Sequence, residues 1–477
     1  MNLAAILDAH PDDAIALVDG DERVSYGVLR ARIAVVRAAL SARGIVPGDR
    51  VALLAENTAG IVVGYFAVLG CGALAVPLNP LAPSAALAHE LSSVGADVLL
   101  ADRVPTPEGI DVVRLADLAS ETTLAPVPVV EVHDDAVAVL MFTSGTAGAP
   151  KAAMLTHGNL RANLDQALLE PQHIRAGDVV LGLLPLHHIF GLNVMLALAL
   201  IGGASVVLTS HFDPIATLSL VRAEGITVIP GVPTMWIAWA KLTSLDEGSF
   251  AGVRLALTGA AHMPEDIARD FHRRTGVVIR EGYGLTEASP VVTTSMGDSP
   301  RQGSIGRVLK GVQARLVDDD GEDVLASDPG ELWLRGPNVF PGYWNDAEAT
   351  ARVLTSEGWL RTGDVAVVDE DGFLYLVDRS KDLIIVSGFN VFPAEVEDAL
   401  LLHPAVAEAA VIGVPNSPTG EAVKAFVVLR PDMVATEAEL VSHCRVYLAR
   451  YKCPGNITFA EQLPRGLGGK ILRRLLR

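Results

Sequence analysis

Residues 143–151 combine glycines, hydroxyl groups and a lysine in one short segment, a composition suited to binding phosphate. The segment follows the apolar run 136–142 and precedes a helical pattern that starts at His157. Small side chains let backbone N–H groups approach phosphate oxygens, hydroxyls donate hydrogen bonds, and lysine adds positive charge. The segment is not a Walker P-loop because Pro150 replaces that motif's second glycine, and an ordinary turn would have a similar composition apart from the lysine. The candidate phosphate-binding residues are Thr143, Ser144, Gly145, Thr146, Gly148 and Lys151.

A second group of reactive side chains lies in the segment 282–287, directly after an apolar strand pattern. The ring of Tyr283 could stack on a base, the hydroxyl of Thr286 could bind phosphate, and the carboxylate of Glu287 could hold magnesium. The flanking glycines would permit close approach of a planar ligand. A structural turn explains this segment equally well.

Three polar segments nearer the C-terminus carry further candidates, each with a plainer alternative. Asp364 stands on a predicted turn and could accept hydrogen bonds from ribose hydroxyls, although a surface turn needs no ligand. The charged run 378–382, followed by Ser387 and Gly388, could equally be a solvated cluster in a linker. Lys470 ends a glycine-rich stretch, where it could reach a phosphate or belong to a mobile basic tail.

Three other motifs are rejected on their context. Residues 70–75 match the dinucleotide pattern GxGxxA, but they follow a helical pattern and lead into a strand, the reverse of the required order. His187 and His188 have no HExxH companion and no nearby Cys/His set, which argues against zinc. The sequence contains no GxSxG elbow, so a serine hydrolase is disfavoured.

The elements that must position these residues change in character along the chain. Between residues 21 and 210, helical patterns alternate with short, continuously apolar runs, which predicts parallel sheets covered by helices on both faces. After Gly303 the apolar residues alternate with period two around Asp-Gly turns, a pattern typical of antiparallel hairpins. A compact α+β pattern begins at Asp378. We therefore predict an α/β protein with a large N-terminal domain, residues 1–377, and a small C-terminal domain, residues 378–477.

Composition narrows the class of protein and its compartment. The 37 basic and 56 acidic residues give a formal charge of −19, which disfavours nucleic acid as a ligand. Three cysteines are too few for a disulfide framework, and no secretory leader is recognisable before Asp8. The apolar stretch Gly191–Leu208 contains Asn193 and a pair of glycines, so it predicts a buried helix, a glycine turn and a strand instead of a membrane span. We expect a cytoplasmic protein without a transmembrane segment.

Taken together and in order, these motifs resemble those of the adenylate-forming (ANL) superfamily, which includes acyl-CoA synthetases, peptide-synthetase adenylation domains and luciferases. The resemblance runs from Ser25 to Arg474 and includes the stretch 330–344. It implies ATP-dependent activation of a carboxylic acid to acyl-AMP with release of pyrophosphate, followed by transfer to CoA. Magnesium would be required. It also implies a distorted antiparallel β-barrel in the large domain and a mobile small domain.

The resemblance implies roles around ATP for residues at matching positions. The segment Thr143–Lys151 corresponds to the loop that moves with pyrophosphate, Thr286 to the residue that binds the α-phosphate, and Glu287 to the magnesium ligand. Asp364 corresponds to the residue that binds the ribose hydroxyls, with Arg379 nearby. The implied base-binding residues are the stacking residue Tyr283 with Gly259, Ala260, Ala261, Glu281, Gly282 and Gly284.

Further positions are implied for the acid and for CoA. Lys470 resembles the catalytic lysine that bridges the carboxylate and the α-phosphate, and His188 matches the histidine beside the acyl site. Asp378 falls at the family's hinge, and Ser387 and Gly388 fall where the pantetheine arm passes. Ala147, Gly466 and the pair His262-Met263 depart from the family's usual residues, and we expect only a modestly weaker hold on ATP.

The expected acid is a medium- or long-chain fatty acid, because Gly282 carries no basic side chain and the stretch Ile229–Trp236 is apolar. An aryl-acid CoA ligase and a stand-alone enzyme that loads a carrier protein are the alternative enzymes. A degenerate nucleotide sensor is a non-enzymatic alternative, but it predicts loss of Glu287 or Lys470, and both are present. The sequence leaves open a monomer or a homodimer, and peripheral membrane contact.

Overall fold

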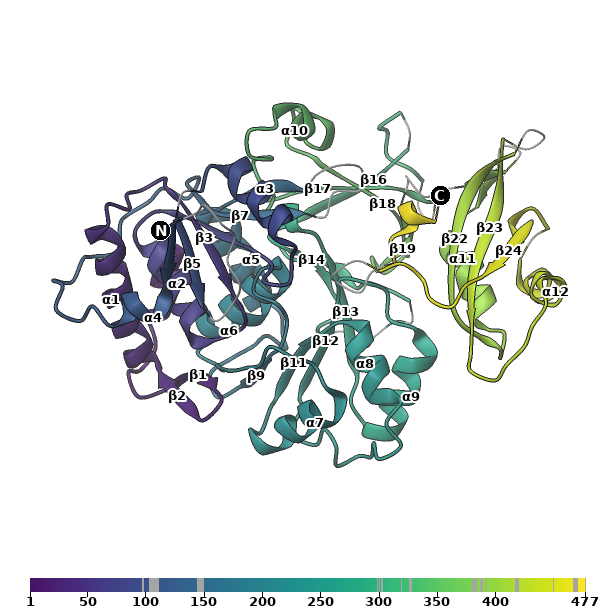
Figure 1. Ribbon diagram of the computed structural model, residues 1–477. Coiled ribbons are helices and arrows are strands. Elements are labelled where there is room, and N and C mark those ends of the chain that lie inside the picture. The colour runs from purple at the N-terminus through teal and green to yellow at the C-terminus, as the bar shows by residue number, and fades with distance from the viewer. Residues whose placement is uncertain are drawn as a thin grey trace. The chain divides into compact units, whose positions relative to one another are not determined.

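The computed structural model in Figure 1 describes the chain apart from residues 97, 103–110, 144–149, 298, 300, 302, 319, 326–327, 380–383, 387–388, 392, 417–419, 449, 466–470 and 477. The chain forms two compact units. Unit 1 comprises Met1–Gln313 and Leu334–Leu360, and unit 2 comprises Ala314–Trp333 and Arg361–Arg477. The chain therefore enters unit 2, returns to unit 1 and enters unit 2 again.

A nine-stranded sheet dominates unit 1, and six of its adjacent strands, β1, β10, β9, β11, β12 and β13, are parallel. Short apolar runs form these strands apart from β13, as the sequence predicts for parallel strands buried on both faces. Helices α8 and α9 lie side by side next to β11–β13 (Figure 1). In spatial order the strands are β15 (Arg307–Val308), β14 (Val291–Thr294), β13 (Ile279–Gly284), β12 (Leu255–Thr258), β11 (Val228–Gly231), β9 (Val179–Gly182), β10 (Ser205–Leu208), β1 (Ile15–Asp19) and β2 (Glu22–Ser25).

A six-stranded sheet completes the core of unit 1. Its strand order is β6 (Asp111–Arg114), β5 (Val98–Asp102), β3 (Arg50–Ala55), β4 (Leu74–Pro77), β7 (Val137–Thr143) and β8 (Lys151–Thr156). Its pairs are parallel except for β7 and β8, which are antiparallel and place Thr143 opposite Lys151. The two ends of the predicted phosphate-binding segment therefore face each other across one strand pair.

Helices connect the strands of unit 1. The apolar stretch 191–208 forms the π-helix η2, helix α6, a glycine turn and strand β10, which confirms the expected helix, turn and strand. No helix in the described part of the chain is long and apolar enough to span a bilayer. The helices of unit 1 are η1 (Leu3–Leu7), α1 (Tyr26–Ala42), α2 (Ala59–Gly70), α3 (Ser84–Val94), α4 (Leu115–Ala119), α5 (His157–Leu168), η2 (Phe190–Ala197), α6 (Leu198–Ile201), α7 (Pro214–Ala223), α8 (Pro233–Ala240), α9 (Glu265–Thr275), η3 (Thr286–Ala288) and α10 (Ala347–Val353).

Unit 2 begins with antiparallel structure. The order of its first sheet is β16 (Gln313–Val317), β17 (Gly330–Arg335), β18 (Leu360–Val368) and β19 (Leu374–Arg379). Strands β18 and β19 form an antiparallel hairpin, and Asp369 accepts hydrogen bonds from the backbone N–H groups of Asp371 and Phe373 in its turn. The period-two pattern with an Asp-Gly turn is thus confirmed here. Closure of these strands into a distorted barrel remains a prediction.

The rest of unit 2 is a compact α+β arrangement, as expected. Its sheet has the order β21 (Phe389–Val391), β20 (Ile384–Val386), β23 (Gly420–Leu429) and β22 (Val406–Asn416), with β24 (Asn456–Phe459) parallel to β23. Helices α11 (Pro393–Leu401) and α12 (Glu437–Tyr447) supply Leu400 and Leu440 to its core. The short helices η4 (Arg450–Lys452) and η5 (Arg473–Leu475) follow. The predicted domain boundary at Asp378 falls on β19 and remains a prediction.

Candidate functional site

Glu287 is held by a segment that follows it by more than fifty residues. It lies on the short helix η3, directly after β13. Its backbone carbonyl accepts a 2.9 Å hydrogen bond from the N–H of Phe340, and its Oε1 accepts a 2.6 Å hydrogen bond from the hydroxyl of Tyr343. Tyr343 is 8% exposed. The candidate metal ligand therefore has both its backbone and its side chain fixed by the stretch 340–343.

Lys151 contacts the ring of the same tyrosine. Its Nζ is 5.3 Å from the ring centroid of Tyr343 and 3.9 Å from Oδ2 of Asp346. A cation at this distance is attracted to the ring. The structure thus brings the candidate phosphate lysine and the candidate magnesium carboxylate to one side chain. The remaining candidates of the phosphate segment, Ser144, Gly145, Thr146 and Gly148, lie outside the described residues.

Buried asparagines fix the backbone around Glu287. Asn338 donates a 2.8 Å hydrogen bond to the carbonyl of Ala288. Asn163, on α5, donates to the carbonyl of Val291 over 2.7 Å and accepts from the N–H of the same residue over 3.1 Å. Unpaired polar groups are costly to bury, so these amides stabilise one conformation of the loop. Asn193, on η2, likewise donates a 2.7 Å hydrogen bond to the backbone carbonyl of Ser289.

The predicted base-binding segments meet at the carboxyl ends of two adjacent parallel strands. Gly259 follows β12 and Gly282 lies on β13, and a Cβ at Gly259 would be 3.5 Å from the carbonyl oxygen of Gly282. Oε1 of Glu281 accepts a 3.4 Å hydrogen bond from the N–H of Met263 and lies 3.6 Å from Nδ1 of His262. The carboxylate thereby secures the loop that carries Ala260 and Ala261. Ligands of open α/β sheets bind at this end of the strands.

Strand β13 ends with Tyr283 and Gly284, and the chain then reaches Thr286 and Glu287 on η3. The N–H of Tyr283 donates a 3.3 Å hydrogen bond to Oγ1 of Thr293 on the antiparallel neighbour β14. Thr286 begins η3. The segment 281–287 therefore runs without interruption from β13 into η3, and the residues that the sequence assigns to base, phosphate and metal follow one another along it.

The two adjacent histidines have different surroundings. Their ring centroids are 4.7 Å apart. Burial lowers the pKa of His187 to about 3, and desolvation also lowers the pKa of His188, although the side chain of His188 remains accessible. Both are therefore neutral near pH 7. Phe190, two residues further on, lies 3.4 Å from the position of a Cβ at Gly259, so the histidine segment borders the base-binding segment.

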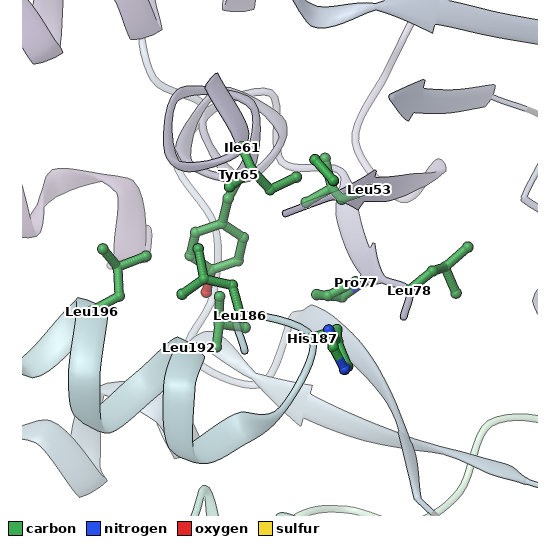
Figure 2. A pocket seen from close by; sticks show the side chains of 10 residues that line it. Leu53, Ile61, Tyr65, Pro77, Leu78, Leu186, His187, Leu192 and Leu196 are labelled. Carbon is green, nitrogen blue, oxygen red and sulfur yellow. The ribbon is translucent and has the colours of Figure 1, made fainter. Parts of the chain in front are cut away.

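His187 borders a small apolar cavity of about 10 Å³, room for roughly one water molecule. Figure 2 shows Tyr65 projecting from α2 toward Leu186 and Leu192, and within the described part of the chain its hydroxyl has no hydrogen-bond partner. Burial raises the pKa of this hydroxyl. We therefore assign His187 to the core and keep His188 as the ligand candidate. The lining residues are Leu53, Ala55, Ile61, Tyr65, Pro77, Leu78, Leu186, His187, Leu192 and Leu196.

In unit 2, Asp364 lies on β18 opposite Arg379 on β19 and is 8% exposed. The hydroxyl of Thr362 accepts a 3.0 Å hydrogen bond from the N–H of Asp364, and Oε1 of Glu331 accepts one of 2.9 Å from the N–H of Gly363. The turn that presents Asp364 is therefore fixed by side chains on either side of it. The side chains of Asp378 and Arg379, and the residues Ser387, Gly388 and Lys470, lie outside the described part of the chain.

The carboxylate of Glu287 suits magnesium better than a metal that needs a cluster of protein ligands. No group of three His, Cys, Asp or Glu side chains that could hold a metal occurs among the described residues. Magnesium usually takes one or two carboxylates and completes its shell with phosphate oxygens and water. Within the described chain, Tyr343 engages Oε1 of Glu287, and Oε2 has no partner. The residues present therefore fit a magnesium ion that arrives with phosphates.

Sequence reasoning missed Asn163, Asn193, Asn338 and Asp346 and gave Tyr343 no individual role. Asn193 carried a signal, because it interrupts an otherwise apolar helix. The other residues carried none, since their partners lie far away along the chain.

Comparison with known proteins gives concordant results. A family model described as "AMP-binding enzyme" matches residues 3–344, and one described as "AMP-binding enzyme C-terminal domain" matches residues 395–470. A long-chain-fatty-acid–CoA ligase of Yersinia pestis is 38% identical, covering 91% of this chain and 86% of its own. A feruloyl-CoA synthase of Amycolatopsis sp is 39% identical, covering 96% and 94%. The ATP-bound crystal structure of MatB from Rhodopseudomonas palustris superposes with a TM-score of 0.94 at 32% identity, covering 100% and 98%.

Proposed function

Because the chain belongs to the family of AMP-binding enzymes, we propose that it activates a carboxylic acid with ATP and transfers the acyl group to CoA. The observation that carries this proposal is that Glu287 and Lys151 both contact Tyr343, next to the proposed base-binding segment. A carboxylate and a lysine that contact the same tyrosine suit a ligand that carries both magnesium and phosphate. The names of the two relatives, both acid–CoA ligases, support the same reaction.

The reaction joins two anions, which explains why cationic groups are needed. A carboxylate oxygen of the acid attacks the α-phosphorus of ATP, and pyrophosphate leaves to give acyl-AMP. The sulfur of CoA then attacks the acyl carbon, and AMP leaves. In this proposal Lys151 holds the departing pyrophosphate, Lys470 bridges the acid and the α-phosphate, and Thr286 donates to the α-phosphate. Magnesium on Glu287, when bound, would neutralise phosphate charge.

The other predicted residues take roles in the same reaction. Asp364 binds the ribose hydroxyls together with Arg379, and His188 borders the acid. The pantetheine arm of CoA passes along Ser387 and Gly388. Tyr283 stacks on adenine, and the remaining base-binding residues are Gly259, Ala260, Ala261, Glu281, Gly282 and Gly284. We propose a domain boundary at residue 378, with a hinge there, and a cytoplasmic location in keeping with three free cysteines.

For the acid, we propose a medium- or long-chain fatty acid. Gly282 carries no basic side chain that could pair with a second carboxylate, and the ring of Phe190 borders the base-binding segment at Gly259, so both features favour an apolar acid. An aromatic acid is the second candidate, because the ring of Phe190 could stack on it and because the feruloyl-CoA synthase is 39% identical. Transfer to a carrier protein in place of CoA is a further alternative.

The test is AMP formation by the full chain with a panel of acids, each measured with and without CoA. We expect CoA-dependent AMP and acyl-CoA with fatty acids of medium or long chain, and little product with acetate or malonate. Preference for aryl acids would select the second candidate. The proposed function would be contradicted if ATP were hydrolysed without forming AMP, or if no acid in the panel gave acyl-CoA.

A companion variant separates the two half-reactions. Lys470→Ala should slow adenylation by roughly two to three orders of magnitude, because it removes charge where the pentavalent phosphorus forms. It should spare thioester formation from supplied acyl-AMP. Equal loss of both half-reactions would exclude this role for Lys470.

A further inference from the structure

We propose that Tyr343 is a positioning residue for ATP binding: its hydroxyl fixes the carboxylate of Glu287 in the orientation that accepts magnesium. This inference rests on the proposed function only for the assignment of magnesium-ATP to Glu287. Tyr343 itself touches neither nucleotide nor acid in the proposal, and it acts through Glu287.

Hydrogen bonds that do not involve Glu287 hold the backbone of Tyr343 in place. The neighbouring residues Gly342 and Trp344 exchange backbone hydrogen bonds with β8: Met154 N–H donates to the carbonyl of Gly342 over 3.0 Å, and Trp344 N–H donates to the carbonyl of Ala152 over 2.8 Å. The N–H of Tyr343 donates a 2.9 Å hydrogen bond to Oγ1 of Thr350. Strand β8 begins with Lys151, so backbone hydrogen bonds connect the segment that carries Tyr343 to the strand that carries the lysine.

The side chain of Tyr343 is fixed as firmly as its backbone. Its ring packs edge-on against Phe340, with centroids 5.0 Å apart and an interplanar angle of 79°. Gly342 has φ +140°, and a Cβ there would lie 2.5 Å from Cγ2 of Thr350, so only glycine permits this turn. A buried aromatic ring in such surroundings has one orientation, and its hydroxyl has one position.

The hydroxyl then determines where Glu287 points. A 2.6 Å hydrogen bond to an ionised carboxylate is of the strong, charge-assisted kind. The N–H of Phe340 holds the backbone of the same residue at 2.9 Å. Oε1 is thereby engaged, and Oε2 remains available to magnesium. Without the hydroxyl, the carboxylate could rotate, and magnesium would have to select one orientation at an entropic cost.

A purely structural role makes a different prediction. If the hydroxyl only satisfied a half-buried carboxylate, its removal would lower stability, and it would weaken ATP binding equally with and without magnesium. A positioning role requires the effect to depend on magnesium and on Glu287.

The experiment compares Tyr343→Phe with the wild type by isothermal titration calorimetry of ATP, in magnesium and in excess EDTA. The substitution keeps the ring, and with it the contacts to Phe340 and Lys151. We expect the dissociation constant in magnesium to rise about 10-fold, since a hydrogen bond to a charged group is lost, and the value in EDTA to change less than about twofold. In the Glu287→Gln background the same substitution should have no further effect in magnesium.

Tyr26→Phe is the matched control. The hydroxyl of Tyr26 is also buried and hydrogen-bonded, to the carbonyls of Leu200 and Ala204 at 3.1 and 2.8 Å. This control should lower the melting temperature and leave ATP affinity unchanged in both buffers.

Three results would overturn the proposal: an unchanged affinity in magnesium, an equal weakening in EDTA, or a full additional loss in the Glu287→Gln background. Failure of the proposed function has a separate signature. A wild-type protein that binds magnesium-ATP but makes no acyl-CoA would contradict the function and leave the role of Tyr343 to be decided by the calorimetry.

Discussion

The side-chain amide of Asn193 donates a 2.7 Å hydrogen bond to the backbone carbonyl of Ser289, and both residues are buried. Asn193 lies on η2, after the histidine pair, whereas Ser289 comes directly after η3, the helix that contains Glu287. This bond joins the proposed acid side of the site to the proposed metal side. A substitution on the acid side can therefore alter ligand binding on the metal side.

Asn193→Leu should weaken magnesium-ATP binding although Asn193 is not a proposed ligand. The substitution leaves the Ser289 carbonyl buried without this donor and costs about 1–3 kcal/mol of stability. Energetic coupling through a packed network is worth about 0.5–2 kcal/mol, so the dissociation constant should rise roughly 2- to 30-fold. Calorimetry and thermal melting of the same samples measure both effects.

Asn2→Leu provides the control for this prediction. Asn2 is also buried, and its amide donates to the carbonyls of Leu69 and Val130 at 2.6 and 3.0 Å. It should lose stability with no change in ATP affinity. If both variants weaken ATP binding alike, the effect of Asn193 reflects general loosening.

Gly259 belongs to the proposed base-binding segment, and its Cβ position faces Phe190 of the histidine segment, where we propose that the acid binds, so Gly259→Val should restrict the acid. A Cβ at this position would meet the ring of Phe190 at 3.4 Å, so the two methyl groups beyond it would press against this ring. We expect kcat/KM to fall more for long acids than for short ones. The sequence alone favours Gly282 as the residue that borders the acid, but a Cβ at Gly282 would lie 3.0 Å from the backbone carbonyl of Thr293. Gly282→Ala should therefore impair all acids equally and lower the melting temperature, and a selective effect of Gly282→Ala would reverse this assignment.

Asp364→Ala should raise the KM for ATP, because a carboxylate hydrogen bond to ribose contributes about 1.5–3 kcal/mol. The wild type should discriminate against 3′-deoxy-ATP, and the variant should treat ATP and 3′-deoxy-ATP alike. This double comparison removes effects on folding, which influence both nucleotides equally. Additive losses from the mutation and the missing hydroxyl would place the ribose elsewhere.

Stability should fall as the pH drops below about 6.5, in part because of His157. Burial is the main cause that lowers its pKa from an ordinary 6.5 to about 4; the N-terminal amino group adds to this, and Asp134 opposes it. The folded protein keeps His157 neutral while the unfolded chain takes up a proton, so stability is retained above 6.5 and lost as the pH falls toward 4. The loss is up to about 1.4 kcal/mol per pH unit.

Melting temperatures between pH 7.5 and 4 test this contribution. His157→Gln should melt lower than wild type at pH 7.5, since the ring accepts a 3.0 Å hydrogen bond from the N–H of Leu3. Its decline with acid should be shallower than that of the wild type. The exposed substitution His272→Gln should leave the decline unchanged, and a wild-type slope in His157→Gln would exclude His157 as a source.

Features that depend on neighbouring residues were the ones the sequence could predict. The parallel strands follow from short apolar runs between helical patterns, and the hairpin β18–β19 follows from alternation around an Asp-Gly turn. The glycine-rich segment ending at Lys151 is likewise a local signal. Tyr343 and Glu287, by contrast, are 56 residues apart, and their bond depends on how β8 pairs with the stretch 340–344. No local pattern encodes such a pairing, and the asparagine contacts were missed for the same reason.

The path of the chain through unit 2 between Gln313 and Leu334 limits how this protein can be recombined with its relatives. Glu287 precedes this excursion and Tyr343 follows it, yet the two share a hydrogen bond. A chimera joined at residue 313 would inherit its carboxylate from one parent and its tyrosine from the other. A junction after Leu360 keeps both from the same parent, so it is the crossover point that shuffling of this scaffold should favour.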